Sequence, residues 1–196
     1  MNQFFHITFV ITFIIFWGIR MAYQKRANDL GGEAEFKEGE GHERIRQILG
    51  VPFMLLFVVF MIRPSILAWS TFSLPNWVQW LGVILGVVSV PLIWWVQWAL
   101  DINFQTRLHV RTEHNLVTHG PYRWVRHPMY TVLYMHLFAI LLLTANWLIA
   151  GTLLLMQTLI IALRLQNEEA AMVEKFGDDY RYYMQQTGRF LPKLLS

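Results

Sequence analysis

The chain has 196 residues, of which 55% are hydrophobic and only 15% are charged, and its mean hydropathy is +0.37. Soluble domains carry about 25% charged residues, so this composition excludes an ordinary soluble enzyme. The 14 Phe, 9 Trp and 7 Tyr residues exclude an intrinsically disordered chain. Because the chain has no Cys, it has no disulfide, no thiolate metal site and no cysteine nucleophile. We therefore expect an all-α integral membrane protein made of one domain.

The apolar runs predict about five membrane spans, since a spanning helix needs about 20 mostly apolar residues. They lie at residues 4–19, 48–69, 77–100, 129–144 and 147–165. The last two belong to one apolar stretch that is too long for a single crossing. Its only polar break near the middle is Thr144-Ala145-Asn146, which predicts a tight helical hairpin. Basic residues follow the first run and none precedes it, so we interpret that run as a retained span and not as a cleaved signal peptide.

Lysine and arginine are distributed unevenly between the loops. Residues 20–46 hold six of the 16, residues 101–126 hold four and residues 164–193 hold five, whereas the remaining segments hold only Arg63. The positive-inside rule then places the first loop, the third loop and the C-terminus in the cytoplasm, with the N-terminus outside. The net charge of +3 is small, and we expect no nucleic-acid partner.

Four histidines occur in the third predicted loop and at the start of the fourth span. His109, His114 and His119 are spaced by five residues, and neither a helix nor a strand places this spacing on one face. With no Cys, and with Glu113 as the nearby carboxylate, a zinc site is disfavoured. We expect no metal and interpret these residues as polar loop histidines.

The pair His127-Pro128 predicts the start of the fourth span, because proline is favoured at the first helical position. Free backbone N–H groups at a helix start bind anions. Arg123 and Arg126 are adjacent, and Tyr122 and Tyr130 are potential donors. Two interpretations stay open at this stage: an anion site, or a capped helix whose basic residues meet lipid headgroups.

A second polar segment follows the fifth span. Arg164 and Glu168 are four residues apart, so they share one helix face. An ionisable pair at a membrane boundary is a candidate functional site, and the alternative is a surface salt bridge beside a snorkelling arginine. Residues 170–184 predict an amphipathic cytoplasmic helix that lies against the membrane face and closes over a pocket. The third span also contains Gly82 and Gly86, a spacing that allows close helix packing.

These segments together resemble the isoprenylcysteine carboxyl methyltransferase family of integral membrane enzymes. The resemblance covers about residues 98–193, which we take as the catalytic portion. The matching motifs are His114-x-Leu116-Val117, Gly120-x-Tyr122, Arg126-His127-Pro128-x-Tyr130, Arg164-x-x-x-Glu168-Glu169, Phe176-Gly177-Asp178-x-Tyr180 and Thr187-Gly188-Arg189-x-x-Pro192. Their order and spacing around a helical hairpin are more specific than any one motif.

The resemblance implies that S-adenosylmethionine binds in a cytoplasm-facing pocket. It implies cofactor contacts from His114, Asn115, Leu116, Val117, Tyr122, His127, Pro128, Met129 and Tyr130. Arg164 and Glu168 fall at the substrate end as the expected catalytic residues. Arg107 stands where some relatives have a glutamine that contacts the cofactor, and its role stays open. The family's acidic triplet is shortened, because Ala170 follows Glu168-Glu169.

The expected reaction is methyl transfer to the carboxylate of a prenylated cysteine or a similar lipophilic acid. A sulfonium carries an already activated methyl group, so the protein has to align the reactants and exclude water. Arg164 is suited to hold a carboxylate as a fork, with Glu168 orienting it or balancing the sulfonium charge. The expected partners are this lipophilic substrate, or a prenylated peptide, and membrane lipid. Methylation of a phospholipid amine or a thiol, and a non-catalytic membrane scaffold, are the alternatives.

Overall fold

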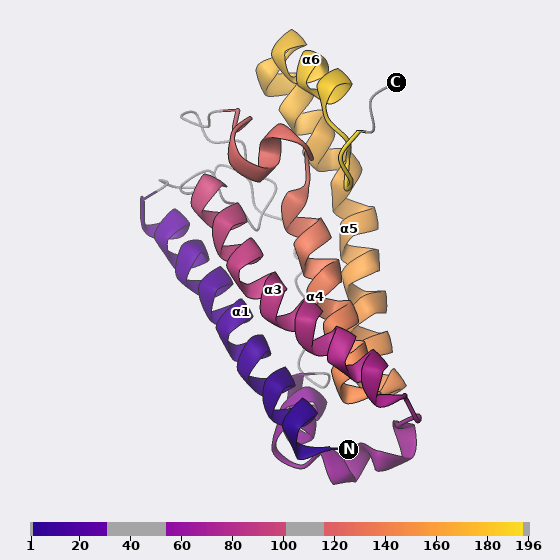
Figure 1. Cartoon of the computed structure of the whole chain (residues 1–196). Helices are drawn as coiled ribbons and strands as arrows, with labels where there is room; N and C mark the ends of the chain where they lie inside the picture. Colours follow the sequence, from indigo (N-terminus) through magenta and orange to yellow (C-terminus); the bar gives the residue numbers. More distant parts are fainter. Residues whose placement is uncertain (1, 31–53, 101–115, 194–196) are drawn as a thin grey trace.

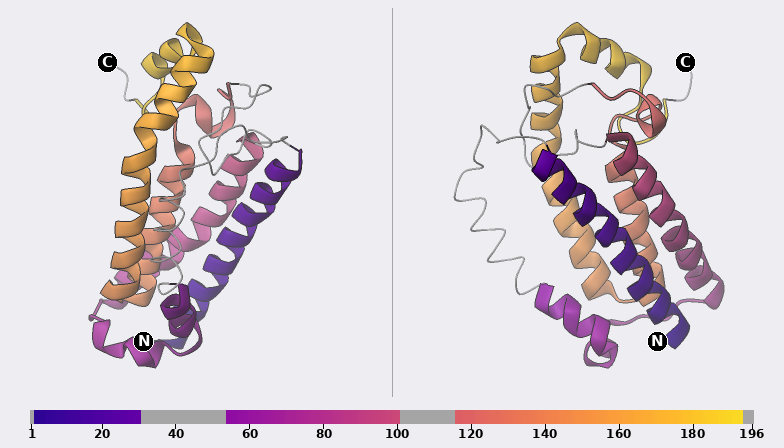
Figure 2. Two further views of the ribbon diagram at one scale, coloured as in Figure 1. Left: turned by 180° about the vertical axis from the view of Figure 1, so that it is seen from behind. Right: turned by 90° about the vertical axis from the view of Figure 1, so that its left-hand side faces the viewer.

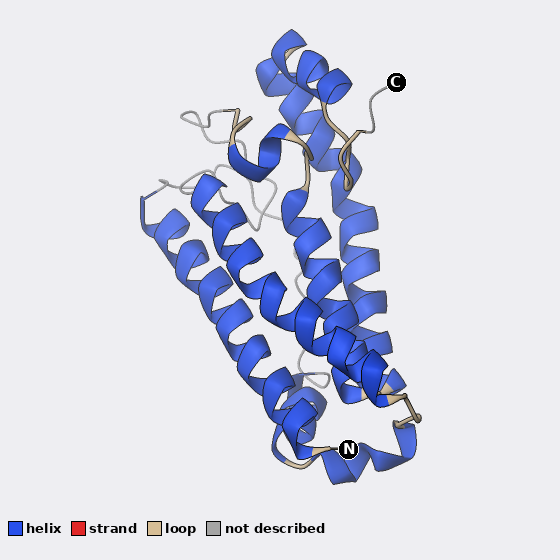
Figure 3. Ribbon diagram, in the orientation of Figure 1, coloured by secondary structure: helices blue, strands red, loops and turns tan. Residues whose placement is uncertain are grey.

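The computed structural model describes residues 2–30, 54–100 and 116–193, and in these residues the protein is helical without a strand (Figure 3). The main helices are α1 (Gln3–Leu30), α3 (Asn76–Leu100), α4 (Pro128–Thr144), α5 (Trp147–Phe176) and α6 (Asp178–Gln186). Two short 3-10 helices are η1 (Pro64–Ser70) and η3 (Gly120–Arg123). The predicted all-α membrane architecture is confirmed.

Three of these helices are long and apolar enough to cross a membrane: α1, α3 and α5. Helix α4 is also apolar, but its 17 residues rise only about 26 Å, slightly less than the hydrocarbon core of a bilayer. Large apolar side chains on α1, α3 and α5 are exposed, including Ile14, Ile84 and Leu163. In a membrane these faces contact lipid tails.

The helical hairpin between the fourth and fifth spans lies where the sequence predicts it. Helix α4 ends at Thr144, Ala145 adopts a left-handed conformation with φ 45°, and α5 begins at Trp147. The side chain of Asn146 accepts a hydrogen bond from the Ile149 amide at 3.0 Å and so caps α5. The same side chain donates to the Leu67 carbonyl at 3.1 Å, which attaches η1 to the hairpin.

The predicted second span, residues 48–69, is not one helix in its described part. Residues 54–62 are helical, Arg63 leaves helical geometry with ψ 77°, and η1 follows from Pro64. Proline cannot donate the backbone hydrogen bond that would continue the first helix, and it disfavours helical geometry at the residue before it. This segment packs on the first half of α1, where Phe57 contacts Phe9 and Phe13. The helical part of this predicted span therefore ends at the Arg63-Pro64 interruption that the sequence contains.

Two helices extend beyond the spans predicted from hydropathy. Helix α1 continues through Arg20 to Leu30, and α5 continues beyond residue 165 to Phe176 before Gly177 ends it. Gly177 has φ 55°, a conformation that glycine adopts without strain. Only the last part of the predicted amphipathic tail, α6, is a separate helix.

Helix α3 packs closely on α4 through small residues. A β-carbon at Gly82 would lie 2.8 Å from the Leu142 β-carbon, so only glycine fits there without a shift. At Gly86 the nearest atoms would be 3.5 and 3.6 Å away, which is ordinary contact. Farther along the same interface, the buried Ser89 hydroxyl lies 2.8 Å from Nδ1 of the buried His136. The predicted glycine spacing therefore serves a helix–helix contact.

Candidate active site

The polar residues of the two motif-bearing segments gather at one end of the helix bundle. The C-terminal ends of α1, α3 and α5 and the start of α4 lie at this end, whereas the N-terminus and the α4–α5 turn lie at the other (Figures 1 and 2). Residues 116–127 approach α4 from this end, and α6 lies beyond it. The candidate site is therefore built by helix ends that are far apart in the sequence.

The Arg164–Glu168 pair forms as the spacing predicts, and a third residue joins it. Arg164 Nη2 lies 3.1 Å from Glu168 Oε1, and both side chains are 22% exposed. The Tyr130 hydroxyl donates to the Glu168 carboxylate and lies 2.8 Å from each of its oxygens. Tyr130 comes from the first turn of α4, so Glu168 connects α5 to the segment expected to bind the cofactor.

Glu169 forms a separate and more buried cluster, to which sequence reasoning assigned no role. Its carboxylate accepts from Arg126 Nε at 3.2 Å and from Arg189 Nε at 3.2 Å, with a further bond from Arg189 Nη2. His127 Nε2 lies 3.3 Å from the same carboxylate. The Glu169 and Arg126 side chains are only 8% and 9% exposed. The sequence signal was present in the matched motifs, which contain all four residues.

Residues 187–190, here called the C-terminal strap, run beside residues 124–127. The Arg126 amide donates to the Gly188 carbonyl at 2.8 Å, and the His127 amide donates to the Arg189 carbonyl at 3.0 Å. The Gly188 amide returns a bond to the Trp124 carbonyl at 3.2 Å. The Thr131 hydroxyl donates to the Phe190 carbonyl at 2.6 Å. The strap is thereby fixed to the entry of α4.

The guanidinium of Arg126 faces inward to these elements. It donates to the Met184 carbonyl at 3.0 Å and the Thr187 carbonyl at 2.5 Å, in addition to Glu169. Its role in the structure is to hold the C-terminal strap. Arg123 stacks over the Trp124 ring at 4.8 Å. The Tyr130 hydroxyl donates to Glu168, and the amides of Tyr130 and Thr131 donate to the His127 carbonyl. Of the two interpretations of the α4 start, these contacts favour a capped helix over an anion site.

Helix α6 closes the same end through tyrosines. The buried Tyr183 hydroxyl donates to the Tyr122 carbonyl at 2.6 Å. Burial raises the pKa of Tyr180 to about 12 and also raises the pKa of Tyr183 and of Tyr122 well above the ordinary range. All three phenols are therefore neutral at physiological pH, and the Tyr183 hydroxyl keeps its proton to donate.

The residues expected to contact the cofactor are divided by the structure. His114 and Asn115, like Arg107, lie outside the described residues. Leu116 and Val117 form an extended entry to η3, with Val117 buried. The remaining five lie together along η3 and the start of α4: Tyr122, His127, Pro128, Met129 and Tyr130. The rings of His127 and Tyr130 stack with centroids 5.6 Å apart.

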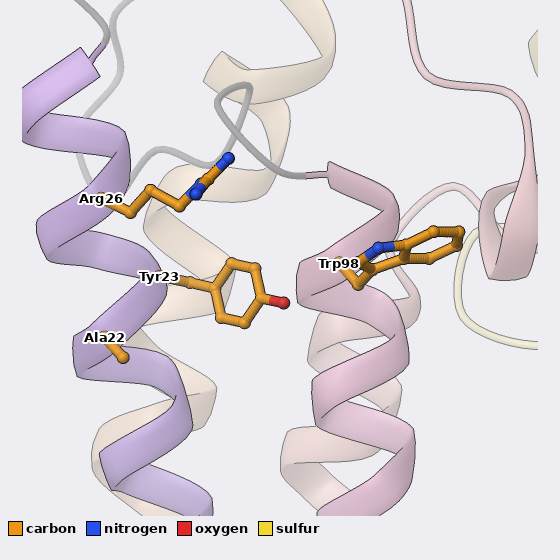
Figure 4. A pocket seen from close by; sticks show the side chains of 4 residues that line it. All are labelled: Ala22, Tyr23, Arg26 and Trp98. Carbon is orange, nitrogen blue, oxygen red and sulfur yellow. The ribbon is translucent and has the colours of Figure 1, made fainter.

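A hollow of about 460 Å³ opens between α1 and α3 at this end of the bundle. Ala22, Tyr23 and Arg26 line it from α1, and Trp98 lines it from α3. Figure 4 shows the side chains of Tyr23 and Arg26 extending from α1 toward α3. Neither the hollow nor α1 was part of the site expected from the sequence.

Comparison with known proteins identifies the same family as the motifs. The family model described as the isoprenylcysteine carboxyl methyltransferase (ICMT) family matches residues 80–174. The resemblance to this family is confirmed for that part of the chain. The match includes most of α3, all of η3 and α4, and most of α5, but not α1 or the strap.

Individual relatives cover similar portions. The uncharacterized protein YpbQ of Bacillus subtilis is 27% identical over 96 residues, which are 48% of this chain and 57% of YpbQ. The protein-S-isoprenylcysteine O-methyltransferase of Tribolium castaneum is 29% identical over 92 residues, 47% of this chain and 33% of the relative. This chain therefore spans only part of either relative.

The fold is also similar to that of a solved structure, the eukaryotic intramembrane Ras methyltransferase ICMT. The two superpose with a TM-score of 0.54 and 22% identity, over 81% of this chain and 54% of the solved one. At this level of identity the comparison supports the membrane fold. Because the superposition covers 81% of this chain, it extends beyond residues 80–174, which the family model matches.

Proposed function

We propose that the chain is an S-adenosylmethionine-dependent methyltransferase that esterifies the carboxylate of a prenylated cysteine or a similar lipophilic acid. The observation that carries this proposal is the Tyr130–Glu168–Arg164 constellation at the bundle end, inside the region matched by the ICMT family. It places an oriented guanidinium next to the segment expected to bind the cofactor.

The residues around Met129 fit a polar cofactor. Gln97 of α3 is fully buried, and its Nε2 lies 3.9 Å from Met129 Sδ, a weak acceptor. Its Oε1 is also buried and has no hydrogen-bond partner in the described part of the chain. An unsatisfied buried amide oxygen costs free energy, and a donor such as the cofactor's ammonium group would remove that cost. Gln97, Met129, Tyr122 and Val117 would then hold S-adenosylmethionine, which supplies an activated methyl group on a sulfonium.

The residues of this chain would then work on the acceptor. Glu168 fixes Arg164 through the 3.1 Å contact, and Tyr130 fixes Glu168 in turn. A guanidinium held in this way presents donors in a defined plane, which suits a carboxylate. Arg164 orients the acceptor oxygen, and no proton has to be removed from a carboxylate before it accepts a methyl group.

Exclusion of water favours this reaction for an electrostatic reason. An anionic oxygen and a cationic sulfonium give two neutral products, so charge is lost on the way to the transition state. Such a step is slowed by solvation of the separate charges and favoured in a dry site. Helix α6 and the C-terminal strap lie over this end of the bundle and shield it from water.

The topology suggests how two different reactants reach one site. We place this end of the bundle at the cytoplasmic face, because the described parts of the three lysine- and arginine-rich segments lie at it. A lipid-modified acid would enter from the membrane between helices, while the cofactor would enter from water. This arrangement gives a reason for the enzyme to be embedded in a membrane.

The contacts of the two glutamates favour a carboxylate acceptor over an amine or a thiol. An amine or a thiol has to lose a proton, so a base is needed. Glu168 already accepts bonds from Arg164 and Tyr130, and Glu169 accepts bonds from Arg126 and Arg189. Proton uptake would have to disrupt these ion pairs. A carboxylate acceptor requires no such step.

The test is transfer of radiolabelled methyl from S-adenosylmethionine to an S-farnesyl-cysteine derivative by the full chain in detergent or vesicles. Base-labile label marks an ester, whereas base-stable label marks an amine or a thiol. Absence of S-adenosylmethionine binding in a titration would refute the enzymatic proposal and favour a scaffold. Arg164→Ala should abolish transfer while cofactor affinity stays within about twofold, and wild-type turnover in this variant would remove Arg164 from the site.

A further inference from the structure

Helix α1 presents a charged residue on its buried face. Phe16, Arg20, Tyr23 and Ala27 follow one another at steps of four, three and four residues, which places them on one side of a helix. Phe16 and Ala27 are fully buried. Arg20 therefore lies on the side of α1 that faces the other helices, and it is only partly exposed.

The surroundings of this turn include the segment expected to bind the cofactor. Phe16 belongs to a buried cluster with Ile93 and Val96 of α3, Tyr122 of η3 and Leu133 of α4. Trp17 and Ile19 of α1 pack against this cluster, as does Met129 at the start of α4. This part of α1 therefore packs against the segment expected to bind the cofactor, although the family model matches the chain only from residue 80.

The charge of Arg20 acts on residues of the candidate site. Its guanidinium lies over the Trp17 ring, 5.3 Å from the centroid. It interacts electrostatically with Tyr130, Arg164 and Tyr122. Tyr130 in turn interacts electrostatically with Glu168, Arg164 and Arg20, so arginines of two different helices, α1 and α5, both act on this phenol.

This convergence is informative because charged residues in apolar helices are expensive and are typically found at functional sites. Two guanidinium groups near one another repel, and this repulsion raises the free energy of the site. An anion that contacts both groups lowers that free energy. The hollow opens within two turns of Arg20 along α1, and Tyr23 belongs both to its lining and to the face of α1 that carries Arg20. An amphiphilic anion would find there both a route between α1 and α3 and a cationic end point.

We propose that Arg20 is a second cation for the acceptor's carboxylate, so that α1 and α5 each contribute one arginine to the acceptor site. This inference rests on the proposed function and deepens it, because it makes a free carboxylate the feature by which the substrate is recognised. The acceptor class is then an amphiphilic acid that enters between α1 and α3. Arg20 acts on binding and orientation and transfers no proton.

The test compares an S-farnesyl-cysteine derivative with its primary carboxamide, which has the same shape and no charge. Binding of each to the full chain is measured in the presence of S-adenosylhomocysteine, so that no turnover occurs. The wild-type protein should prefer the acid. Arg20→Gln should weaken acid binding by about 10- to 100-fold, as expected for a lost charge-assisted hydrogen bond, and leave carboxamide binding unchanged. Arg20→Lys keeps the charge and should retain part of the preference.

Lys25→Gln is the matched control, because it removes the same charge from an exposed position of the same helix. It should leave both affinities unchanged. Equal weakening of acid and carboxamide in Arg20→Gln, or an unchanged acid affinity, would overturn the role of Arg20, as would a wild-type protein that does not distinguish the two compounds. A wild-type protein that prefers the acid through Arg20 but transfers no methyl would instead refute the proposed function alone. If Arg20→Gln fails to bind S-adenosylhomocysteine, the comparison of acid and carboxamide binding is made with Arg20→Lys. Loss of S-adenosylhomocysteine binding in that variant too would assign Arg20 a structural role and overturn the proposal.

Discussion

Replacing Glu169 by Gln keeps the size of the side chain and removes the negative charge from the cluster that fixes the C-terminal strap. Gln can still accept a hydrogen bond at Oε1, but its NH₂ group would face a guanidinium donor. Arg126 would then be left as a buried cation that donates to the carbonyls of Met184 and Thr187. We expect this change to destabilise the fold more than any exposed substitution in the same region.

The magnitude follows from burial. Removing one partner of a buried ion pair costs about 3–5 kcal/mol, and the Arg126 and Glu169 side chains are 9% and 8% exposed. Arg189 is 46% exposed, so its pair with Glu169 adds little after screening by solvent. Since Arg126 keeps two carbonyl partners, we expect the lower limit, about 3 kcal/mol. For a chain of this length that corresponds to a melting temperature lower by about 6–12 °C.

The assay is thermal unfolding of the purified full chain in one detergent, followed together with limited proteolysis near the C-terminus. Asp178→Asn is the matched control, because it makes the same acid-to-amide change in the exposed pair with Arg181. It should leave the melting temperature unchanged. A Glu169→Gln protein that melts within 2 °C of the parent (about 0.5–1 kcal/mol) and resists proteolysis equally would refute the reasoning that Glu169 holds the strap.

Three further changes test other parts of the structure. Tyr130→Phe removes only the bond to Glu168 and should lower the turnover number by about tenfold or more. Tyr130→Ala also removes the stacked ring and should weaken S-adenosylmethionine binding in a titration. Normal turnover in Tyr130→Phe would contradict the role of the hydroxyl. Gly82→Ala should lower the melting temperature because the new β-carbon would lie 2.8 Å from the Leu142 β-carbon, while Gly86→Ala should be tolerated. Equal melting temperatures of these two variants would show that α3 and α4 are not in close contact at Gly82. Burial raises the pKa of Tyr180 to about 12, whereas the pKa of an unfolded tyrosine is about 10. The stability contributed by the neutral phenol is therefore complete below pH 10 and is lost as the pH rises through 12. The decrease of the melting temperature between pH 10 and 12 should be smaller in Tyr180→Phe, and an identical pH profile in that variant would contradict this assignment.

Local sequence patterns were sufficient for the membrane helices that are independent of distant contacts. The apolar run at 77–100 coincides with α3, and the polar break at Thr144-Ala145-Asn146 coincides with the hairpin turn. In both cases the determinant is local, either hydrophobic length or a capping side chain. The Arg164–Glu168 contact is also local, because i and i+4 residues are neighbours in any helix.

Patterns that depend on tertiary structure were not predictable in this way. The Arg63-Pro64 interruption of the run at 48–69 is visible in the sequence, but the packing of the described part of this run on α1 is not. The end of α5 could not be placed from hydropathy, because the helix continues as a polar helix after its apolar part ends. Its true end is set by the backbone conformation of Gly177.

The cluster around Glu169 shows the same limit at the level of the site. Arg126 and Glu169 are 43 residues apart, and Arg189 follows Glu169 by 20. No periodicity relates such positions, so composition could not show that they form one ion-pair cluster. Their presence in the matched motifs was a signal of importance, but the motifs did not distinguish a structural role from a catalytic one. Arg20 gave even less signal, because it lies outside the residues that the family model matches.

The two neighbouring glutamates of α5 show how one helix end can serve structure and chemistry together. Successive residues of an α-helix point about 100° apart, so Glu168 faces Tyr130 and Arg164 while Glu169 faces Arg126 and Arg189. His127 lies between them, 3.3 Å from Glu169 and 4.0 Å from Glu168. The strap that Glu169 secures is therefore mechanically joined to the pair that orients Arg164. A change in either glutamate should affect the other through the start of α4, where Glu169 contacts His127 and Glu168 contacts Tyr130.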